Sequence, residues 1–179
     1  MVSTVEKLLA RNSEYAKSHT RFPTFAEFAA SGLPAPRTVI LTCSDPRCIP
    51  EKFFQLNLGE ALVIRNLGGY AENALPTILG ADTFVHFTEI LVVKHTDCGG
   101  LIIRNANVKD GLKKLAPHSH EAIEDMRFGE ITTSLEENAE RDVASRKASE
   151  FLRTELKERV FGFVYDLETG RVEPTAGKA

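Results

Sequence analysis

Two short polar motifs contain side chains that bind metal ions and transfer protons. The first, CSDPR, begins at Cys43, and the second, HTDC, runs from His95 to Cys98. Two thiolates and one imidazole form a known ligand set for catalytic zinc, in which the fourth position is left for water. A closed structural site needs a fourth protein ligand. Cys48 is the only remaining cysteine, and we predict that it is a small buried residue and not that ligand. The pattern therefore favours one open zinc site formed by Cys43, His95 and Cys98.

Asp45 and Arg47 give this predicted site a pair of catalytic residues. A zinc ion with two thiolates and a neutral imidazole has no net formal charge, so it acidifies its water less than a site with neutral ligands does. Asp45 lies two residues after Cys43. That spacing lets its carboxylate accept a hydrogen bond from zinc-bound water, or bind the metal and close the site. The guanidinium of Arg47 matches this carboxylate, and we expect the pairing to keep Asp45 ionised and away from the zinc.

Strands must bring the two motifs together, because His95 lies 52 positions after Cys43. Four short apolar runs are predicted as strands, at residues 38–42, 61–64, 90–93 and 161–165. Helical segments separate these runs, which predicts an α/β fold with a mostly parallel sheet and right-handed crossovers. If the strand order begins 2-1-3, the first and third strands end side by side at the crevice where open α/β sheets bind ligands.

Three helices are predicted from apolar periodicity and capping signals. The first two cover Val5–Lys17 and Asn73–Phe87. The third begins at a capping box formed by Ser134 and Glu137 and continues as a long helix. Its predicted buried stripe consists of Ala139, Val143, Ala148, Phe151, Leu152 and Leu156.

Composition narrows the class of protein. The chain has 179 residues, of which 42% are hydrophobic, and its formal net charge is -3. These values predict one globular domain spanning residues 1–179. A basic surplus and an apolar run of about 18 residues are both absent, so we expect neither a nucleic-acid partner nor a membrane. Three cysteines without a secretory signal favour a reducing compartment, and we predict a cytoplasmic protein.

The chain resembles the β-class carbonic anhydrases at the residues that could do chemistry. CSDPR is similar to that family's C-S-D-S-R motif, and the segment HTDCG at 95–99 is similar to its H-T-D-C-G motif. The segment RNLGG at 65–69 resembles the R-N-A-G loop, and GFVYDLETG at 162–170 resembles the last strand and turn. The resemblance covers about residues 35–170, and the combined motifs are specific.

This resemblance implies reversible hydration of carbon dioxide to bicarbonate and a proton by zinc-bound hydroxide. It implies one zinc ion per subunit, held by Cys43, His95 and Cys98, and an Asp45–Arg47 dyad that orients the hydroxide. The implied sheet has the order 2-1-3-4, with an antiparallel edge strand possible and helices on both faces. Residues 35–170 would form the catalytic core. Residues 1–34 would form a helical arm that packs on a partner subunit in a homodimer or a dimer of dimers.

Two departures from the family pattern affect these expectations. Pro46 replaces a small polar residue and fixes the backbone between Asp45 and Arg47. Ile40 stands where one regulated branch of the family has a tryptophan, and the chain contains no tryptophan. We therefore expect the open form of the site, with Asp45 paired to Arg47.

Two alternative functions remain open at this point. Relatives with the same zinc ligands hydrolyse carbonyl sulfide or carbon disulfide, which are linear molecules like carbon dioxide. A more distant alternative is a zinc-stabilised binding module without catalysis, which would have a closed site with four ligands. Nucleotide-binding glycine loops and the C-x-x-C motif of thiol oxidoreductases do not occur in the sequence.

Overall fold

The computed structural model describes residues 4–32 and 35–175, which belong to two compact units. The first unit, residues 1–34, contains helices α1 (Val5–Ala16) and α2 (Phe25–Ala30). The hydroxyl of Thr4 caps α1, and a capping box begins α2. The helix predicted near residue 5 is confirmed. The predicted domain range also includes residues 1–3, 33–34 and 176–179, which lie outside the described part of the chain.

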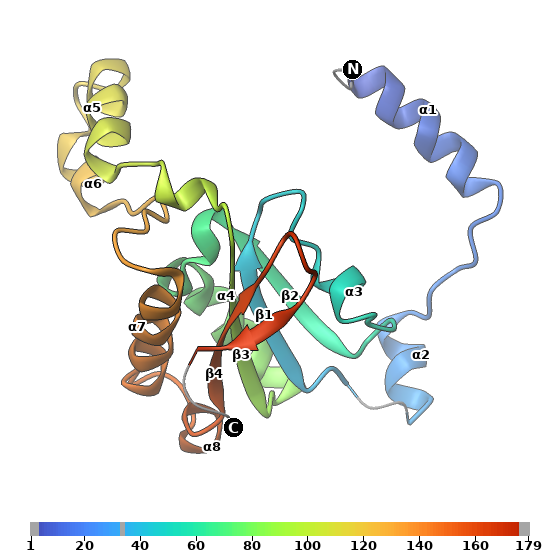
Figure 1. Ribbon diagram of the computed structural model, residues 1–179. Helices are drawn as coiled ribbons and strands as arrows, with labels where there is room; N and C mark the ends of the chain where they lie inside the picture. The colour runs from blue at the N-terminus through green and yellow to red at the C-terminus, as the bar shows by residue number, and fades with distance from the viewer. Residues whose placement is uncertain (1–3, 33–34, 176–179) are drawn as a thin grey trace. The chain divides into compact units, whose positions relative to one another are not determined.

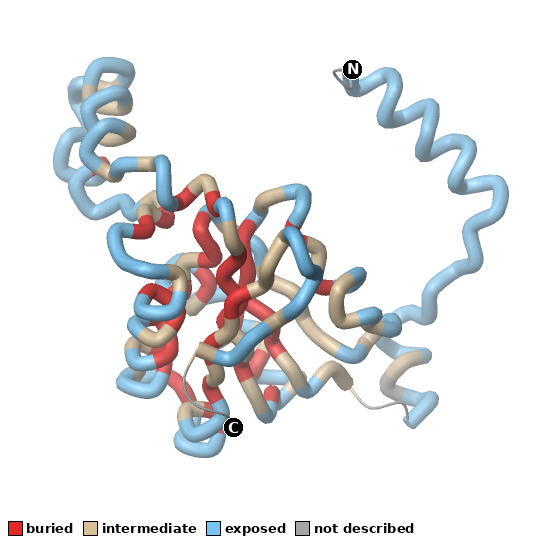
Figure 2. The backbone as a smooth tube through the Cα atoms, viewed as in Figure 1, coloured by how far each residue is buried: buried red, intermediate tan, exposed pale blue. Residues whose placement is uncertain are grey.

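The second unit is built on a five-stranded sheet (Figure 1). Its strands are β1 (Thr38–Cys43), β2 (Ala61–Asn66), β3 (Glu89–His95), β4 (Val160–Tyr165) and β5 (Val172–Pro174). The order is β2-β1-β3-β4-β5, and only β5 pairs antiparallel, with β4. The predicted α/β fold, its 2-1-3-4 order and its antiparallel edge strand are confirmed. Strands β1 and β3 are neighbours, and their buried residues form the red centre of Figure 2.

Helices cover the two faces of the sheet unequally. Helices α4 (Ala71–Val85), α7 (Leu135–Lys147) and α8 (Thr154–Lys157) lie over one face, where the main apolar core is buried. The other face carries α3 (Pro50–Phe53), whose Phe53 ring stacks on Tyr165 with the ring centroids 4.1 Å apart. The remaining elements are the short 3-10 helices η1 (Leu67–Gly69) and η2 (Gly99–Leu101), and the exposed helices α5 (Asn105–Leu115) and α6 (His120–Asp125).

The third predicted helix begins as expected but ends early. The Ser134–Glu137 capping box is present, and α7 ends at Lys147. Ala148 and Phe151 are exposed, so their assignment to a buried stripe is wrong. The inner face of α7 is largely polar, and its Asp142 pairs with a lysine that β3 buries beneath the helix. An apolar periodicity could not reveal such a face.

The predicted helix near residues 73–87 is confirmed with shifted ends. Helix α4 begins at Ala71 and is closed by His86, which adopts a left-handed backbone conformation with φ 57°. Within residues 4–32 and 35–175, no helix is long and apolar enough to cross a membrane.

Candidate metal centre

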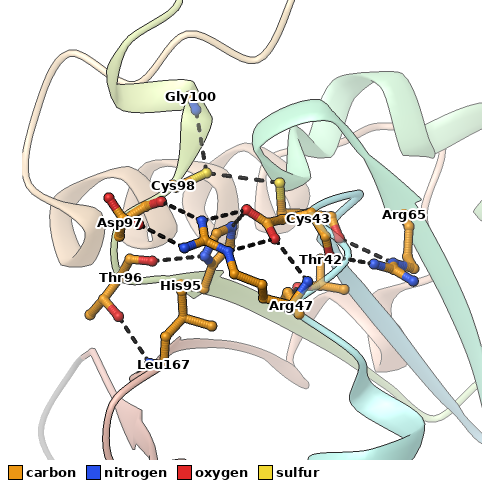
Figure 3. Close-up of polar contacts among 12 residues, drawn as sticks. Thr42, Cys43, Arg47, Arg65, His95, Thr96, Asp97, Cys98, Gly100 and Leu167 are labelled. Atoms are coloured by element: carbon orange, nitrogen blue, oxygen red, sulfur yellow. Dashed lines mark hydrogen bonds and ion pairs between the residues drawn. The ribbon is translucent and has the colours of Figure 1, made fainter. Parts of the chain in front are cut away.

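The three predicted ligands meet at the carboxyl ends of two adjacent strands. Cys43 is the last residue of β1, His95 is the last residue of β3, and Cys98 follows three residues later. All three are buried, and their ligand atoms lie within 4.8 Å of one another. Figure 3 shows the two sulfur atoms facing each other, 3.8 Å apart, with the cysteines unbridged. The sheet topology therefore brings together residues that the sequence separates.

The geometry of these ligand atoms fits a metal ion. Two thiolates bound to one tetrahedral zinc at about 2.3 Å lie about 3.8 Å apart, which equals the observed sulfur separation. His95 Nδ1 lies 2.8 Å from the carbonyl oxygen of Thr96 and must donate to it, because a carbonyl only accepts. The lone pair of the neutral ring is then on Nε2. That atom is buried without a hydrogen-bond partner among the described residues, as a metal ligand would be.

The cluster also favours a negative sulfur. The thiol of Cys98 donates to Cys43 Sγ, and this bond lowers the pKa of Cys43 to about 4, although burial opposes the shift. Retaining that proton, together with burial, raises the pKa of Cys98 above its ordinary range. Burial lowers the pKa of His95, but the adjacent Cys43 sulfur, with smaller contributions from the Thr96 carbonyl and Asp45, outweighs it and the pKa is raised. A thiolate beside an imidazole is a donor set that attracts a divalent cation.

Asp45 lies beside this cluster and is held by Arg47. Arg47 Nε donates to Asp45 Oδ1 over 3.0 Å, and Arg47 Nη2 donates to Asp45 Oδ2 over 2.8 Å. These bonds lower the pKa of Asp45 to about 2 and raise that of Arg47. Asp45 Oδ2 is 4.0 Å from His95 Nε2. The expected pairing is present, and it leaves an ionised carboxylate oxygen next to the free histidine nitrogen.

Pro46 fits the turn that joins these two residues. The Cys48 N–H donates to the Asp45 carbonyl over 3.0 Å, which closes a four-residue turn with proline at its second position. Proline is favoured there because its ring fixes φ near the required value. The Arg47 N–H also donates to Asp45 Oδ1 over 2.8 Å. Proline at this position therefore supports the Asp45–Arg47 contact. Cys48 is fully buried, as predicted.

The RNLGG segment holds the backbone of the first motif in place. Arg65 donates to the carbonyl oxygens of Cys43 and Asp45, so it fixes the backbone of the first motif. Gly68 and Gly69 both have positive φ, and a Cβ on Gly69 would come within 3.0 Å of the Thr42 backbone. Glycine accommodates this conformation and this close approach with the least strain.

Three residues at the site carry contacts that the motif analysis did not assign. Arg65 holds the first motif, Asp97 contacts Arg47, and Lys94 is buried beside His95. Lys94 had a visible signal, because a lysine inside a strand buried on both faces needs a polar partner. The signal for Asp97 was weaker, since an aspartate after a strand is common in turns.

Comparison with known proteins identifies the family. The family model described as "Carbonic anhydrase" matches residues 38–172, which is most of the chain and includes strands β1 to β4 and the three candidate ligands. The chain belongs to the β-carbonic anhydrase family. One member, a carbonic anhydrase of Pseudomonas aeruginosa, is 27% identical over 164 residues, covering 80% of this chain and 74% of the relative.

Two further relatives carry names that give different activities. A carbonic anhydrase structure from Glaciozyma antarctica superimposes with a TM-score of 0.78 and 28% identity, and the match covers 98% of this chain and 100% of that one. A carbon disulfide hydrolase of Acidianus sp. is 35% identical over 92 residues, covering 50% of this chain and 45% of the relative. Family membership is therefore clear, and the relatives differ in the substrate that their names give.

Proposed function

We propose that this protein catalyses the reversible hydration of carbon dioxide to bicarbonate and a proton, with zinc held by Cys43, His95 and Cys98. The observation that carries the proposal is the ionised Asp45 carboxylate, which Arg47 holds 4.0 Å from His95 Nε2, an atom without a hydrogen-bond partner among the described residues. Zinc in this site would supply a water molecule of lowered pKa as the nucleophile.

The chain's own residues orient that chemistry. With a pKa of about 2, Asp45 is ionised at neutral pH and can only accept hydrogen bonds. It therefore orients a water or hydroxide beside the cluster so that the O–H group of that molecule donates to the carboxylate. Arg47 occupies both oxygens of Asp45. A carboxylate held in this way stays available as an acceptor and is kept from becoming a fourth ligand. The site then remains open to a small substrate.

Stopped-flow measurement of carbon dioxide hydration by the zinc-loaded protein tests the proposal. We expect turnover in the wild type. Asp45→Asn should retain zinc and lose about 100-fold or more in kcat, because the amide no longer provides an ionised acceptor. Near-normal turnover in this variant would contradict the assigned role of Asp45.

A ligand variant provides the matched control for the metal. Cys98→Ser should lose zinc, measured as metal content after dialysis, together with all turnover, because the cluster keeps only one thiolate. Full zinc occupancy in Cys98→Ser would remove Cys98 from the ligand set. A wild type that binds zinc and hydrates no carbon dioxide would refute the proposed reaction.

Hydrolysis of carbonyl sulfide or carbon disulfide is the alternative function. It is favoured by the 35% identity to the Acidianus sp. enzyme, which exceeds the 27% identity to the carbonic anhydrase of Pseudomonas aeruginosa but covers a shorter segment. The same zinc-loaded protein can be assayed for sulfide release from both substrates. Sulfide release without carbon dioxide hydration would assign the alternative. Zinc binding without either activity would leave a zinc-stabilised binding module.

We also propose that the protein self-associates as a homodimer or a dimer of dimers, with the arm of residues 1–34 packed on the partner subunit. Helix α1 buries none of its residues, although it carries Val5, Leu8 and Leu9. Leu67 and Ile102, which follow β2 and β3 near the ligands, are exposed as well. Light scattering of the full chain, compared with a chain lacking residues 1–34, tests the assembly.

The proposed compartment is the cytoplasm. Its support is chemical: Cys43, Cys48 and Cys98 are all free thiols, and two of them would have to remain reduced to bind zinc. Fractionation of cells that express the protein tests this assignment.

A further inference from the structure

We propose that Asp97 is a positioning residue that fixes Arg47 and thereby the Asp45 carboxylate. The inference rests on the proposed function, because it assigns a role within the same site. It concerns the residue between the second and third candidate ligands, which, in the part of the chain that the structure describes, is hydrogen-bonded to Arg47 and not to the ligand atoms (Figure 3).

The geometry places Arg47 between two acidic residues. Arg47 Nη1 donates to Asp97 Oδ2 over 2.7 Å, and Arg47 Nη2 donates to the Asp97 carbonyl over 3.0 Å. Nε and Nη2 of the same guanidinium donate to Asp45. Four hydrogen bonds therefore use four of the five N–H donors that arginine possesses. The planar group is held from both edges, so it cannot turn away from Asp45 without breaking bonds to Asp97.

The backbone of Asp97 is adapted to this contact. Its φ is 54°, in the left-handed region that residues other than glycine seldom occupy, although aspartate and asparagine tolerate it best. In this conformation both the carboxylate and the carbonyl oxygen of Asp97 reach Arg47. Such strain at a ligand-bearing turn has to be maintained by its surroundings, and Arg47 supplies two of the bonds that do so.

Exposure indicates that the contact orients Arg47 and adds little to stability. The side chain of Asp97 is 77% exposed and that of Arg47 is 51% exposed, so their ion pair is screened by water. Asp45, by contrast, is 13% exposed in its side chain. Removing the Asp97 charge should therefore leave folding unchanged and loosen the hold of Arg47 on the more buried carboxylate.

Asp97→Asn tests the inference in the zinc-loaded protein. Asparagine has nearly the same size and tolerates the left-handed backbone, but it removes the negative charge. Glu168→Gln is the matched control, because Glu168 lines the same surface hollow as Arg47 and Asp97 yet, among the described residues, forms no ion pair with Arg47. We expect kcat for carbon dioxide hydration to fall about two- to five-fold in Asp97→Asn with KM unchanged, and to stay constant in Glu168→Gln.

A double-variant comparison separates positioning from a direct effect of charge. In an Arg47→Ala background, Asp97→Asn should have no further effect on kcat, because the residue through which Asp97 acts is gone. An equal loss of kcat with and without Arg47 would overturn the inference.

Arginine side-chain NMR on ¹⁵N-labelled, zinc-loaded protein provides a readout that does not depend on activity. The Nη–H signals of Arg47 are identified by their disappearance in Arg47→Ala. We expect them to be separate in the wild type and in Glu168→Gln, and averaged by rotation in Asp97→Asn. Unchanged signals in Asp97→Asn would refute the role of Asp97. If the wild type hydrates no carbon dioxide, the proposed function fails, and these signals alone decide whether Asp97 holds Arg47.

Discussion

Two clusters of charged side chains flank His95 in the sequence, and burial separates them. Lys94 precedes the histidine and donates to Asp142 Oδ2 over 2.6 Å, with side chains that are 1% and 5% exposed. Asp97 follows the histidine and shares Arg47 with Asp45, at the surface. The same types of group thus form a buried ion pair on one side and a solvent-exposed contact on the other.

The buried cluster is satisfied at every donor. Lys94 Nζ also donates to the carbonyl oxygens of Gly68 and Gly69, so all three of its hydrogens are used. Burial lowers the pKa of Lys94, and the charge of Asp142 opposes that shift. A charge in such surroundings cannot change partners without a large penalty. A bond lost from the exposed cluster costs less stability, since water replaces it.

Lys94→Met should produce the largest loss of stability. The substitution leaves Asp142 buried without a partner and removes the donor from two glycine carbonyls. We expect the free energy of unfolding of the zinc-loaded protein to fall by about 3–5 kcal/mol, measured by denaturant titration. A change below about 1 kcal/mol would contradict the distinction between the two clusters.

The double variant Lys94→Met, Asp142→Leu is the control for this prediction. It removes both charges, so no ion remains buried alone, and it should be more stable than Lys94→Met. A double variant less stable than the single one would show that the cost arises from packing and not from an unpaired charge.

Asp82 forms an ion pair of intermediate burial and should have an intermediate effect. Its carboxylate is 10% exposed and accepts hydrogen bonds from Arg153 Nε, Arg153 Nη2 and the Phe87 N–H. We expect Asp82→Asn to lower the free energy of unfolding at pH 7 by about 2 kcal/mol, measured in urea.

The contribution of Asp82 should depend on pH in a defined direction. The bonds from Arg153 hold its pKa below the ordinary value of 3.8, although burial opposes them. A carboxylate with a lowered pKa stabilises the folded state above the unfolded pKa and loses that contribution as pH falls through the folded pKa. The difference between wild type and Asp82→Asn should therefore be constant near neutrality and shrink below about pH 4. A difference that grows in acid would have the wrong sign. Both proteins keep the same candidate ligands, so any loss of zinc in acid should affect them equally and cancel in the comparison.

The sequence was most informative where chemistry sits at the ends of strands. The β-branched runs before Cys43 and His95 predicted two buried parallel strands, and neighbouring parallel strands must end at the same edge of a sheet. That rule was enough to place the two cysteines and the histidine together. The Asp45–Arg47 contact was also predictable, because it is local and its partners are two residues apart.

Contacts between distant residues could not be predicted in the same way. Lys94 and Asp142 are 48 residues apart, and no local sequence pattern around either residue indicates that the two form a pair. The polar inner face of α7 was not predictable for the same reason, because its Asp142 pairs with Lys94 of a distant strand. The role of Asp97 depends on a left-handed φ of 54°, which a single residue type does not specify.

Arg47→Ala should have the smallest effect on stability. We expect the free energy of unfolding of the zinc-loaded protein to change by less than about 1 kcal/mol. The guanidinium is half exposed, and water can solvate the Asp97 carboxylate once the guanidinium has been removed. Turnover should nevertheless fall at least about ten-fold, since Asp45 loses the partner that holds its carboxylate in place. Denaturant titration and stopped-flow hydration of the same preparation measure both quantities. A loss of stability comparable to that of Lys94→Met would mean that the exposed cluster stabilises the fold as the buried one does, and the contrast between the two sides of His95 would then have no basis in burial.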